Sequence, residues 1–274
     1  MFAGLEALAA DGSVSSFAQA NGLRYQRRSR PPALSGGPFE LYTNAKVRGS
    51  VSGPGWVAGN LDAGDGIVRR QSTFFGVPVT SAAAGPLISG QVPPIGYLAL
   101  TLSQQLPNMI LDSKRNDPSL GSSLLHPPSL DQRLSLEGDF DTHFDLFVPS
   151  GYESDALFIF TPDLMALLID EAGDCDVEIR GNQLVIYAGS ELDLSRADTW
   201  RWIERIMSVV GAKTFSRTQR YTDDRVTGDM TPAAHRLRRR LGSGQIKNMV
   251  FLVIVIAAFL AAGLAVVLFN SLAP

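Results

Sequence analysis

The sequence contains a single cysteine, Cys175, among its 274 residues. One thiol cannot form an intramolecular disulfide, as is typical of a protein in a reducing compartment. A zinc site made only of cysteines is excluded for the same reason. Asp174 and Asp176 flank the thiol, and acidic neighbours raise a thiol pKa and disfavour the reactive thiolate. The sequence therefore excludes a disulfide scaffold and argues against a cysteine nucleophile.

Sequence motifs of the common enzyme classes are also absent. There is no G-x-x-x-x-G-K-[ST] phosphate loop, no G-x-S-x-G nucleophile turn and no H-E-x-x-H zinc helix. The glycines between residues 49 and 66 do not open a helix after a strand, as a dinucleotide-binding motif requires, so we assign them to turns. We expect no cofactor.

The first residues lack the basic segment of a secretory signal peptide. Residues 1–10 carry no Lys or Arg, and Glu6 and Asp11 interrupt the apolar pattern. We therefore expect the N-terminal part of the chain to remain in the cytoplasm.

A long apolar run near the C-terminal end is the clearest positive feature. It extends from Met249 to Phe269 without a charged, amide or hydroxyl side chain. About 21 residues in a helix span roughly 31 Å, which is the thickness of the hydrocarbon core of a bilayer. A charge at the centre of such a helix would cost about 3 kcal/mol on insertion scales. The sequence predicts a transmembrane helix over residues 248–270 and a short tail over 271–274.

The charges beside this run predict its orientation. Cationic residues are retained on the cytoplasmic side of a membrane, and a basic group precedes the run: Arg236, Arg238, Arg239, Arg240 and Lys247. We therefore expect a single-pass, tail-anchored protein of the cell inner (plasma) membrane with its N-terminal domain in the cytoplasm. The basic group is also suited to attract anionic lipid, although a topology signal alone explains it.

Charge is divided unevenly along the chain. Residues 1–210 contain 15 Lys and Arg against 24 Asp and Glu, a net charge of −9, and residues 211–247 contain 9 against 3, a net charge of +6. An acidic domain is a poor binder of nucleic acid, whose phosphates require cations. We expect no nucleic-acid partner.

Hydrophobic periodicity and turn residues predict an α+β fold, with a mainly antiparallel sheet and a few flanking helices. We predict strands over residues 39–46, 47–51, 55–60, 67–75, 97–102 and 108–112, and a hairpin with arms 177–179 and 184–187. We predict helices over residues 2–10, 14–21, 152–157, 162–172 and 195–210, the last ending at Gly211. The predicted organisation is a cytosolic domain over 1–210 and a flexible basic linker over 211–247.

One polar run is a candidate site. If residues 137–145 are extended, alternate side chains share one face, and these are Asp139, Asp141, His143 and Asp145. Three carboxylates and an imidazole are suited to bind Mg²⁺ or Mn²⁺, or to act as a general base in hydrolysis. The alternative is the solvent face of an ordinary strand, with Phe140 and Phe144 in the core.

Part of the sequence resembles a family of uncharacterised bacterial membrane proteins that have a cytosolic domain of unknown function. The resemblance rests on residues 131–140 (DQRLSLEGDF), 144–146 (FDL), 152–153 (YE) and 160–165 (FTPDLM), with residues 17–22 (FAQANG) in support. It covers about half of the predicted domain. It implies no particular activity, and His143 is not one of the matching residues, which favours a structural role for the acidic run.

Two functions remain open. The first is a non-enzymatic cytosolic module at the membrane that binds a protein partner or the lipid surface. The alternative is a membrane-tethered, metal-assisted hydrolase that uses the acidic run. Small residues every fourth position allow close helix contact, so the transmembrane helix is also a candidate homodimer surface through Ala257, Ala261 and Ala265.

Overall fold

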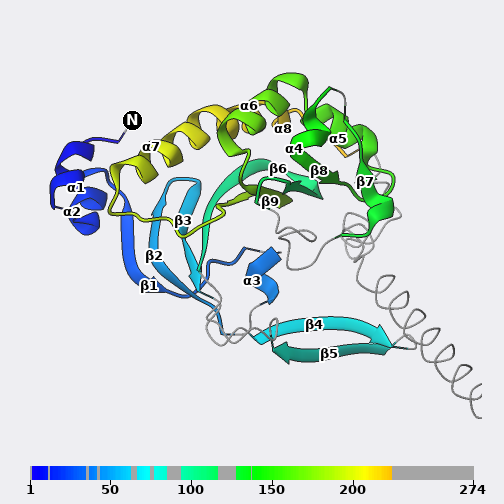
Figure 1. Ribbon diagram of the computed structural model, residues 1–274, viewed down its shortest axis with the longest axis horizontal. Coiled ribbons are helices and arrows are strands. Elements are labelled where there is room, and N and C mark those ends of the chain that lie inside the picture. Colours follow the sequence, from blue (N-terminus) through cyan, green and yellow to red (C-terminus); the bar gives the residue numbers. More distant parts are fainter. Residues whose placement is uncertain are drawn as a thin grey trace, which may run out of the picture.

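The structure, a computed structural model, describes residues 2–11, 13–34, 37–41, 44–62, 67–74, 77–84, 94–116, 128–136 and 138–223. A seven-stranded antiparallel sheet carries a layer of helices on one face (Figure 1). The α+β class with a mainly antiparallel sheet and flanking helices is thus confirmed. No helix in the described ranges has both the length and the apolar character needed to cross a bilayer. The predicted transmembrane helix, residues 248–270, lies outside those ranges.

The sheet is built around one long strand. Its order is β1-β2-β3-β6-β8-β7, and β9 pairs with the other edge of β6. The strands are β1 (Arg24–Ser29), β2 (Lys46–Gly53), β3 (Trp56–Asp62), β6 (Ile95–Ser113), β7 (Arg133–Leu134), β8 (Phe144–Phe147) and β9 (Asp176–Tyr187). The strands β4 (Ile67–Phe74) and β5 (Val77–Ala84) pair separately as a two-stranded sheet. The predicted strands over 47–51, 55–60, 67–75, 97–102 and 108–112 all fall on these elements.

The centre of the sheet is sharply bent. Nine residues of straight strand span about 30 Å, yet the Tyr187 hydroxyl donates to Glu178 Oε2 over 2.9 Å. β9 therefore folds back near Gly181, whose φ of +58° favours glycine. β6 follows the bend, since its register with β9 shifts between Thr101 and Leu106. Both arms of the predicted hairpin are extended, but they pair with β6 and not with each other, so the predicted pairing is wrong.

Helices cover the convex face of the sheet and enclose the main core (Figure 1). Trp200 lies at the N-terminal end of this layer with no exposed surface. Its indole nitrogen donates to the Leu194 carbonyl over 2.8 Å, and the rings of Phe2 and Phe17 pack 5.2 and 4.5 Å away. The layer comprises α1 (Leu5–Asp11), α2 (Val14–Ala20), α4 (Phe140–His143), α5 (Glu153–Ile159), α6 (Pro162–Ala172), α7 (Ala197–Ile206), the π-helix η2 (Met207–Gly211) and α8 (Ala212–Thr218). A 3-10 turn, η1 (Leu130–Gln132), precedes β7.

The concave face has a second, smaller core. The helix α3 (Gly37–Leu41) lies beneath the arch of the sheet (Figure 1), and the Phe39 ring contacts Tyr97 with centroids 4.9 Å apart. The predicted strand over residues 39–46 is therefore wrong at its start. A short apolar segment does not distinguish helix from strand by itself, and here the concave face supplies the tertiary contacts.

The last helix continues past the predicted end of the domain. Gly211 has a helical φ of −62°, so it does not cap a helix, and a Cβ at this residue would lie 2.6 Å from Leu100 Cδ1. This glycine allows close contact between the helix and β6. Thr214 and Thr218 of α8 are buried, and the Tyr221 hydroxyl donates to Asp155 Oδ1 over 2.8 Å. Residues 212–221 thus belong to the folded part, beyond the predicted boundary at 210.

Candidate functional site

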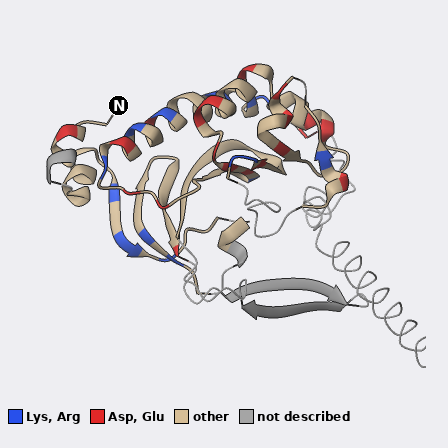
Figure 2. Cartoon of the chain, in the orientation of Figure 1, with Lys and Arg blue, Asp and Glu red and all other residues tan. Residues whose placement is uncertain are grey.

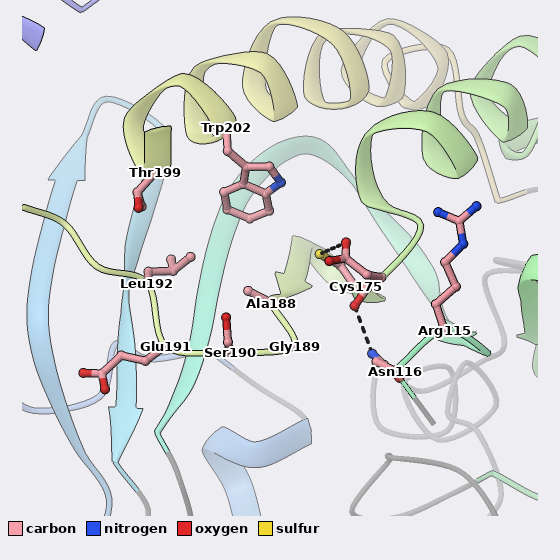
Figure 3. Close-up of a pocket in the computed structure, with 11 residues that line it drawn as sticks. Arg115, Asn116, Cys175, Ala188, Gly189, Ser190, Glu191, Leu192, Thr199 and Trp202 are labelled. Atoms are coloured by element: carbon pink, nitrogen blue, oxygen red, sulfur yellow. Dashed lines mark hydrogen bonds between the residues drawn. The ribbon is translucent and has the colours of Figure 1, made fainter. Parts of the chain in front are cut away.

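A cleft of about 490 Å³ lies where four segments meet beside α7 (Figure 3). One segment follows β6, one joins α6 to β9, one follows β9, and the fourth is the part of α7 that contains Thr199 and Trp202. The Trp202 side chain extends from α7 toward the loop that contains Ala188, and Glu191 points away from the centre (Figure 3). The lining residues are Arg115, Asn116, Asp174, Cys175, Ala188, Gly189, Ser190, Glu191, Leu192, Thr199 and Trp202.

The loop after β9 is fixed to the sheet by one buried amide. Asn60 on β3 is only 4% exposed. Its Nδ2 donates to the Leu192 carbonyl over 2.8 Å, and the Leu192 amide donates to its Oδ1 over 2.6 Å. Asn60 thus pairs with Leu192 as a neighbouring strand would, and it sets the position of one wall of the cleft. Asn60 could not be predicted from the sequence, because the two partners are 132 positions apart.

The opposite wall is held by side-chain hydrogen bonds between the ends of β6 and β9. Asn116 Nδ2 donates to the Asp174 carbonyl over 3.3 Å and to Asp176 Oδ1 over 3.1 Å. Asp176 Oδ1 also accepts the Ser113 backbone N–H over 2.9 Å. Both walls are therefore positioned before any ligand arrives, which lowers the entropy cost of binding.

Cys175 lines the cleft, but its thiol is unreactive. The side chain is buried, and burial together with the adjacent Asp174 carboxylate raises the pKa of its thiol well above the usual range. The thiol stays protonated at neutral pH and is a poor nucleophile. The effect of the acidic neighbours predicted from the sequence is confirmed.

Trp202 and Arg115 give the cleft its binding character. The indole of Trp202 is half-buried and presents an apolar surface beside Leu192, whereas Arg115 is an exposed cation at the rim. Aromatic and arginine side chains carry much of the binding energy in protein interfaces. The arrangement is suited to accept an apolar or aromatic side chain with a polar or acidic group beside it.

The acidic run identified in the sequence adopts a different local structure from the one predicted. Residues 140–143 form the short helix α4, and only residues 144–147 are extended, as β8. The prediction that four alternate side chains share one strand face is therefore wrong. Asp139, directly before α4, and His143, its last residue, are four residues apart and lie close together, with Oδ2 and Nε2 separated by 3.8 Å.

The other two carboxylates of the run are engaged elsewhere. Asp141 accepts the Leu136 backbone N–H over 3.0 Å and the Ser135 hydroxyl. Asp145 pairs with Lys114 over 2.9 Å and with Arg133 over 2.7 Å.

Three cations thus lie close to the run, because Arg115 Nη2 is also 3.4 Å from His143 Nδ1. These cations would oppose a divalent metal ion. Within the described ranges, no three His, Cys, Asp or Glu side chains are arranged to hold a metal.

The remaining predicted site residues lie outside the described ranges. They are the membrane-flanking Arg236, Arg238, Arg239, Arg240 and Lys247, and the alanines of the predicted dimer surface, Ala257, Ala261 and Ala265. Their roles stay predictions.

Comparisons with family models and with curated proteins found no match. Among solved structures, the chain is similar to the crystal structure of the mycobacterial trehalose monomycolate transport factor A, TtfA. The TM-score is 0.43 at 12% sequence identity, over 74% of this chain and 94% of that chain.

Proposed function

We propose that this protein is a non-enzymatic binding module that the segment 248–270 anchors in the membrane. Its folded domain faces the cytoplasm, and its cleft receives a segment of a partner protein. The half-buried Trp202, which extends from α7 into a cleft with two prepositioned walls, carries this proposal. An indole in such a place gains contact area when a partner covers it, which is a property of interface hot spots.

The side chains that hydrolysis would require are protonated or paired with other charges, which favours a binding function over a catalytic one. The Cys175 thiol is kept protonated. His143 lies between Asp139 and Arg115, and Asp145 lies between two cations. A metal-assisted hydrolase would need carboxylates directed at a common point. The alternative function therefore has no geometric support from the described residues, and a metal measurement tests it directly.

Membrane attachment is supported by the sequence outside the described ranges. The apolar run from Met249 to Phe269 has the length of a bilayer-spanning helix, and the basic group before it agrees with a cytoplasmic domain. A binding module fixed in this way would recruit its partner to the membrane surface.

The test is a comparison of three full-length proteins purified in mild detergent: the wild type, Trp202→Ala and Arg201→Ala. Arg201 is the matched control, since it is the preceding residue of α7 and its side chain is 56% exposed. We expect mass spectrometry to find a stoichiometric protein with the wild type and with Arg201→Ala, and to find it lost with Trp202→Ala. The Trp202→Phe variant should retain part of it, because an aromatic ring still extends into the cleft.

Two results would contradict the proposal. The first is an identical set of co-purifying proteins with Trp202→Ala and with Arg201→Ala, when thermal unfolding shows both to be folded. The second is a stoichiometric divalent metal in the wild type that disappears in Asp141→Ala and His143→Ala, which would establish the hydrolase instead.

A further inference from the structure

Four exposed arginines lie within seven residues at one edge of the sheet. Arg24, Arg27 and Arg28 are on β1 and Arg30 follows it, and we refer to these four residues as the arginine strip. Figure 2 shows basic residues gathered along β1, at the lower left of the molecule. No described carboxylate forms an ion pair with the strip.

The strip is exceptional in its surroundings. The predicted domain has a net charge of −9 over residues 1–210, so positive charge is concentrated here against the general balance. Arg28 is also directly opposite Arg48 on β2, and like charges in this position disfavour strand pairing. Arg48 itself has Asp62 as a partner at 3.0 Å.

Protection of an edge strand does not account for the whole strip. β1 pairs only with β2, and charged side chains on an edge strand prevent pairing with other chains. One or two charges serve that purpose, whereas the strip places four cations on and beside β1 and faces a fifth on the neighbouring strand. A surface of this kind fits an anionic partner that presents many negative groups at once.

We infer that the arginine strip is the surface through which the tethered domain lies on anionic lipid headgroups. The inference rests on the proposed membrane anchor, which would keep the domain beside a bilayer. Guanidinium groups bind phosphate oxygens in pairs of hydrogen bonds, which makes arginine well suited to lipid phosphates. The cytoplasmic leaflet carries a negative surface potential that attracts clustered cations.

The chain length permits this contact. Between Asp223, the last described residue, and Met249 there are about 25 residues, which can extend to at most about 90 Å. The anchor also raises the effective concentration of headgroups at the strip, so each arginine needs to contribute little. Contact with lipid would fix the orientation of the domain and therefore of the cleft.

The experiment places one fluorescent label on the full-length protein in vesicles. Gln26→Cys puts an environment-sensitive label within the strip, and Ser208→Cys puts it on the exposed surface of η2, in the helical layer. The native Cys175 is buried and stays unlabelled. The vesicles contain quencher lipids in phosphatidylcholine, with or without phosphatidylglycerol. We expect quenching of the label at residue 26 but not of the label at residue 208. This quenching should require phosphatidylglycerol. It should weaken at high salt, because screening shortens the range of electrostatic attraction.

Charge reversal provides the matched control. Arg27→Glu with Arg28→Glu should abolish the quenching at residue 26. Arg201→Glu with Arg205→Glu makes the same change in net charge on α7 and should leave the quenching intact. Thermal unfolding checks that each variant is folded.

Integration is measured separately, by resistance of the vesicle-bound chain to alkaline extraction, so that the two ideas fail differently. The lipid surface alone is overturned if the chain is integrated but its label at residue 26 is not quenched. Equal quenching without phosphatidylglycerol, or equal quenching in the Arg27→Glu, Arg28→Glu variant, overturns it as well. If the partner of the strip is an acidic protein, the chain is integrated and the label at residue 26 is not quenched. A chain that alkaline treatment extracts overturns the anchor and the lipid surface together.

Discussion

Asn60 links the sheet to the cleft through a single side chain. It accepts from the backbone amide of Leu192 and donates to the carbonyl of the same residue. Asn60→Ala would leave both backbone groups buried without a partner, at about 1–3 kcal/mol for each. We therefore expect the free energy of unfolding to fall by about 2–6 kcal/mol. Urea unfolding monitored by tryptophan fluorescence measures this loss.

Asn182→Ala is the control for this prediction. Asn182 is half-buried at the bend of β9, and its replacement should change stability by less than about 0.5 kcal/mol. Equal losses in the two variants would show that the Asn60 bonds contribute nothing particular to the fold.

Three buried acids of high pKa predict how stability depends on pH. Burial raises the pKa of Cys175, Tyr97 and Tyr187 above their usual values. In the unfolded chain these groups lose their protons near pH 8.5 for the thiol and near pH 10 for the phenols. Their raised folded pKa values therefore stabilise the fold fully below those pH values. This contribution declines as pH rises, by about 1.4 kcal/mol per pH unit for each group.

Urea unfolding from pH 7 to 11 checks this dependence. We expect the free energy of unfolding to fall from about pH 8.5 upward. Cys175→Ala should flatten the curve between about pH 8.5 and 10 whatever it does to the stability at pH 7, because only the thiol titrates there. A wild-type curve that stays flat across this interval would contradict the assignment.

The acidic run shows why single residues were hard to place from the sequence. Asp139 and His143 are four positions apart, a spacing that suits a helix face as well as a strand face. The residues that decide their environment, Lys114, Arg115 and Arg133, come from other parts of the chain. Periodicity identified the run as a place of concentrated polar groups, but its chemistry depends on these distant cations.

At the scale of elements, the sequence predicted most of what has local causes. The helix over 162–172 begins with a threonine and a proline, which suit the cap and the first helical position, and it matches α6 from Pro162 to Ala172. The strands after residue 46 were also predicted, as short segments bounded by turn residues. These elements follow from neighbouring residues alone.

The elements that were missed depend on contacts across the fold. Gly211 reads as a helix end, yet the helix passes through it, and the lack of a side chain there allows close contact with Leu100 on β6. Phe39 reads as part of a strand, yet it lies in α3 against the concave face. The arms of β9 read as a hairpin, yet each pairs with an arm of β6. In each case the deciding partner is far away in the sequence.

At the scale of the whole molecule, charge and position act together in the proposed function. The domain is acidic in total, and basic residues are concentrated in the arginine strip and in the sequence before the apolar run. An acidic domain with these two exceptions would meet an anionic bilayer in one orientation. A fixed orientation would present the cleft beside Trp202 in a constant direction to a partner protein.

Two truncations separate folding from attachment. Tyr221 and Asp155 join the end of the described chain to α5, with the hydroxyl and carboxylate oxygens 2.8 Å apart. A chain ending after Asp223 should therefore keep the unfolding midpoint of the full-length domain. A chain ending after Val210 should aggregate, because it loses α8 with the buried Thr214 and Thr218.

Full-length protein should resist extraction from membranes by alkaline carbonate. The 223-residue chain should leave the membrane fraction in high salt, since headgroup contacts through the arginine strip are screened there. If it stays in the membrane after both treatments, the anchor is not the segment 248–270, and the orientation argued from it fails as well.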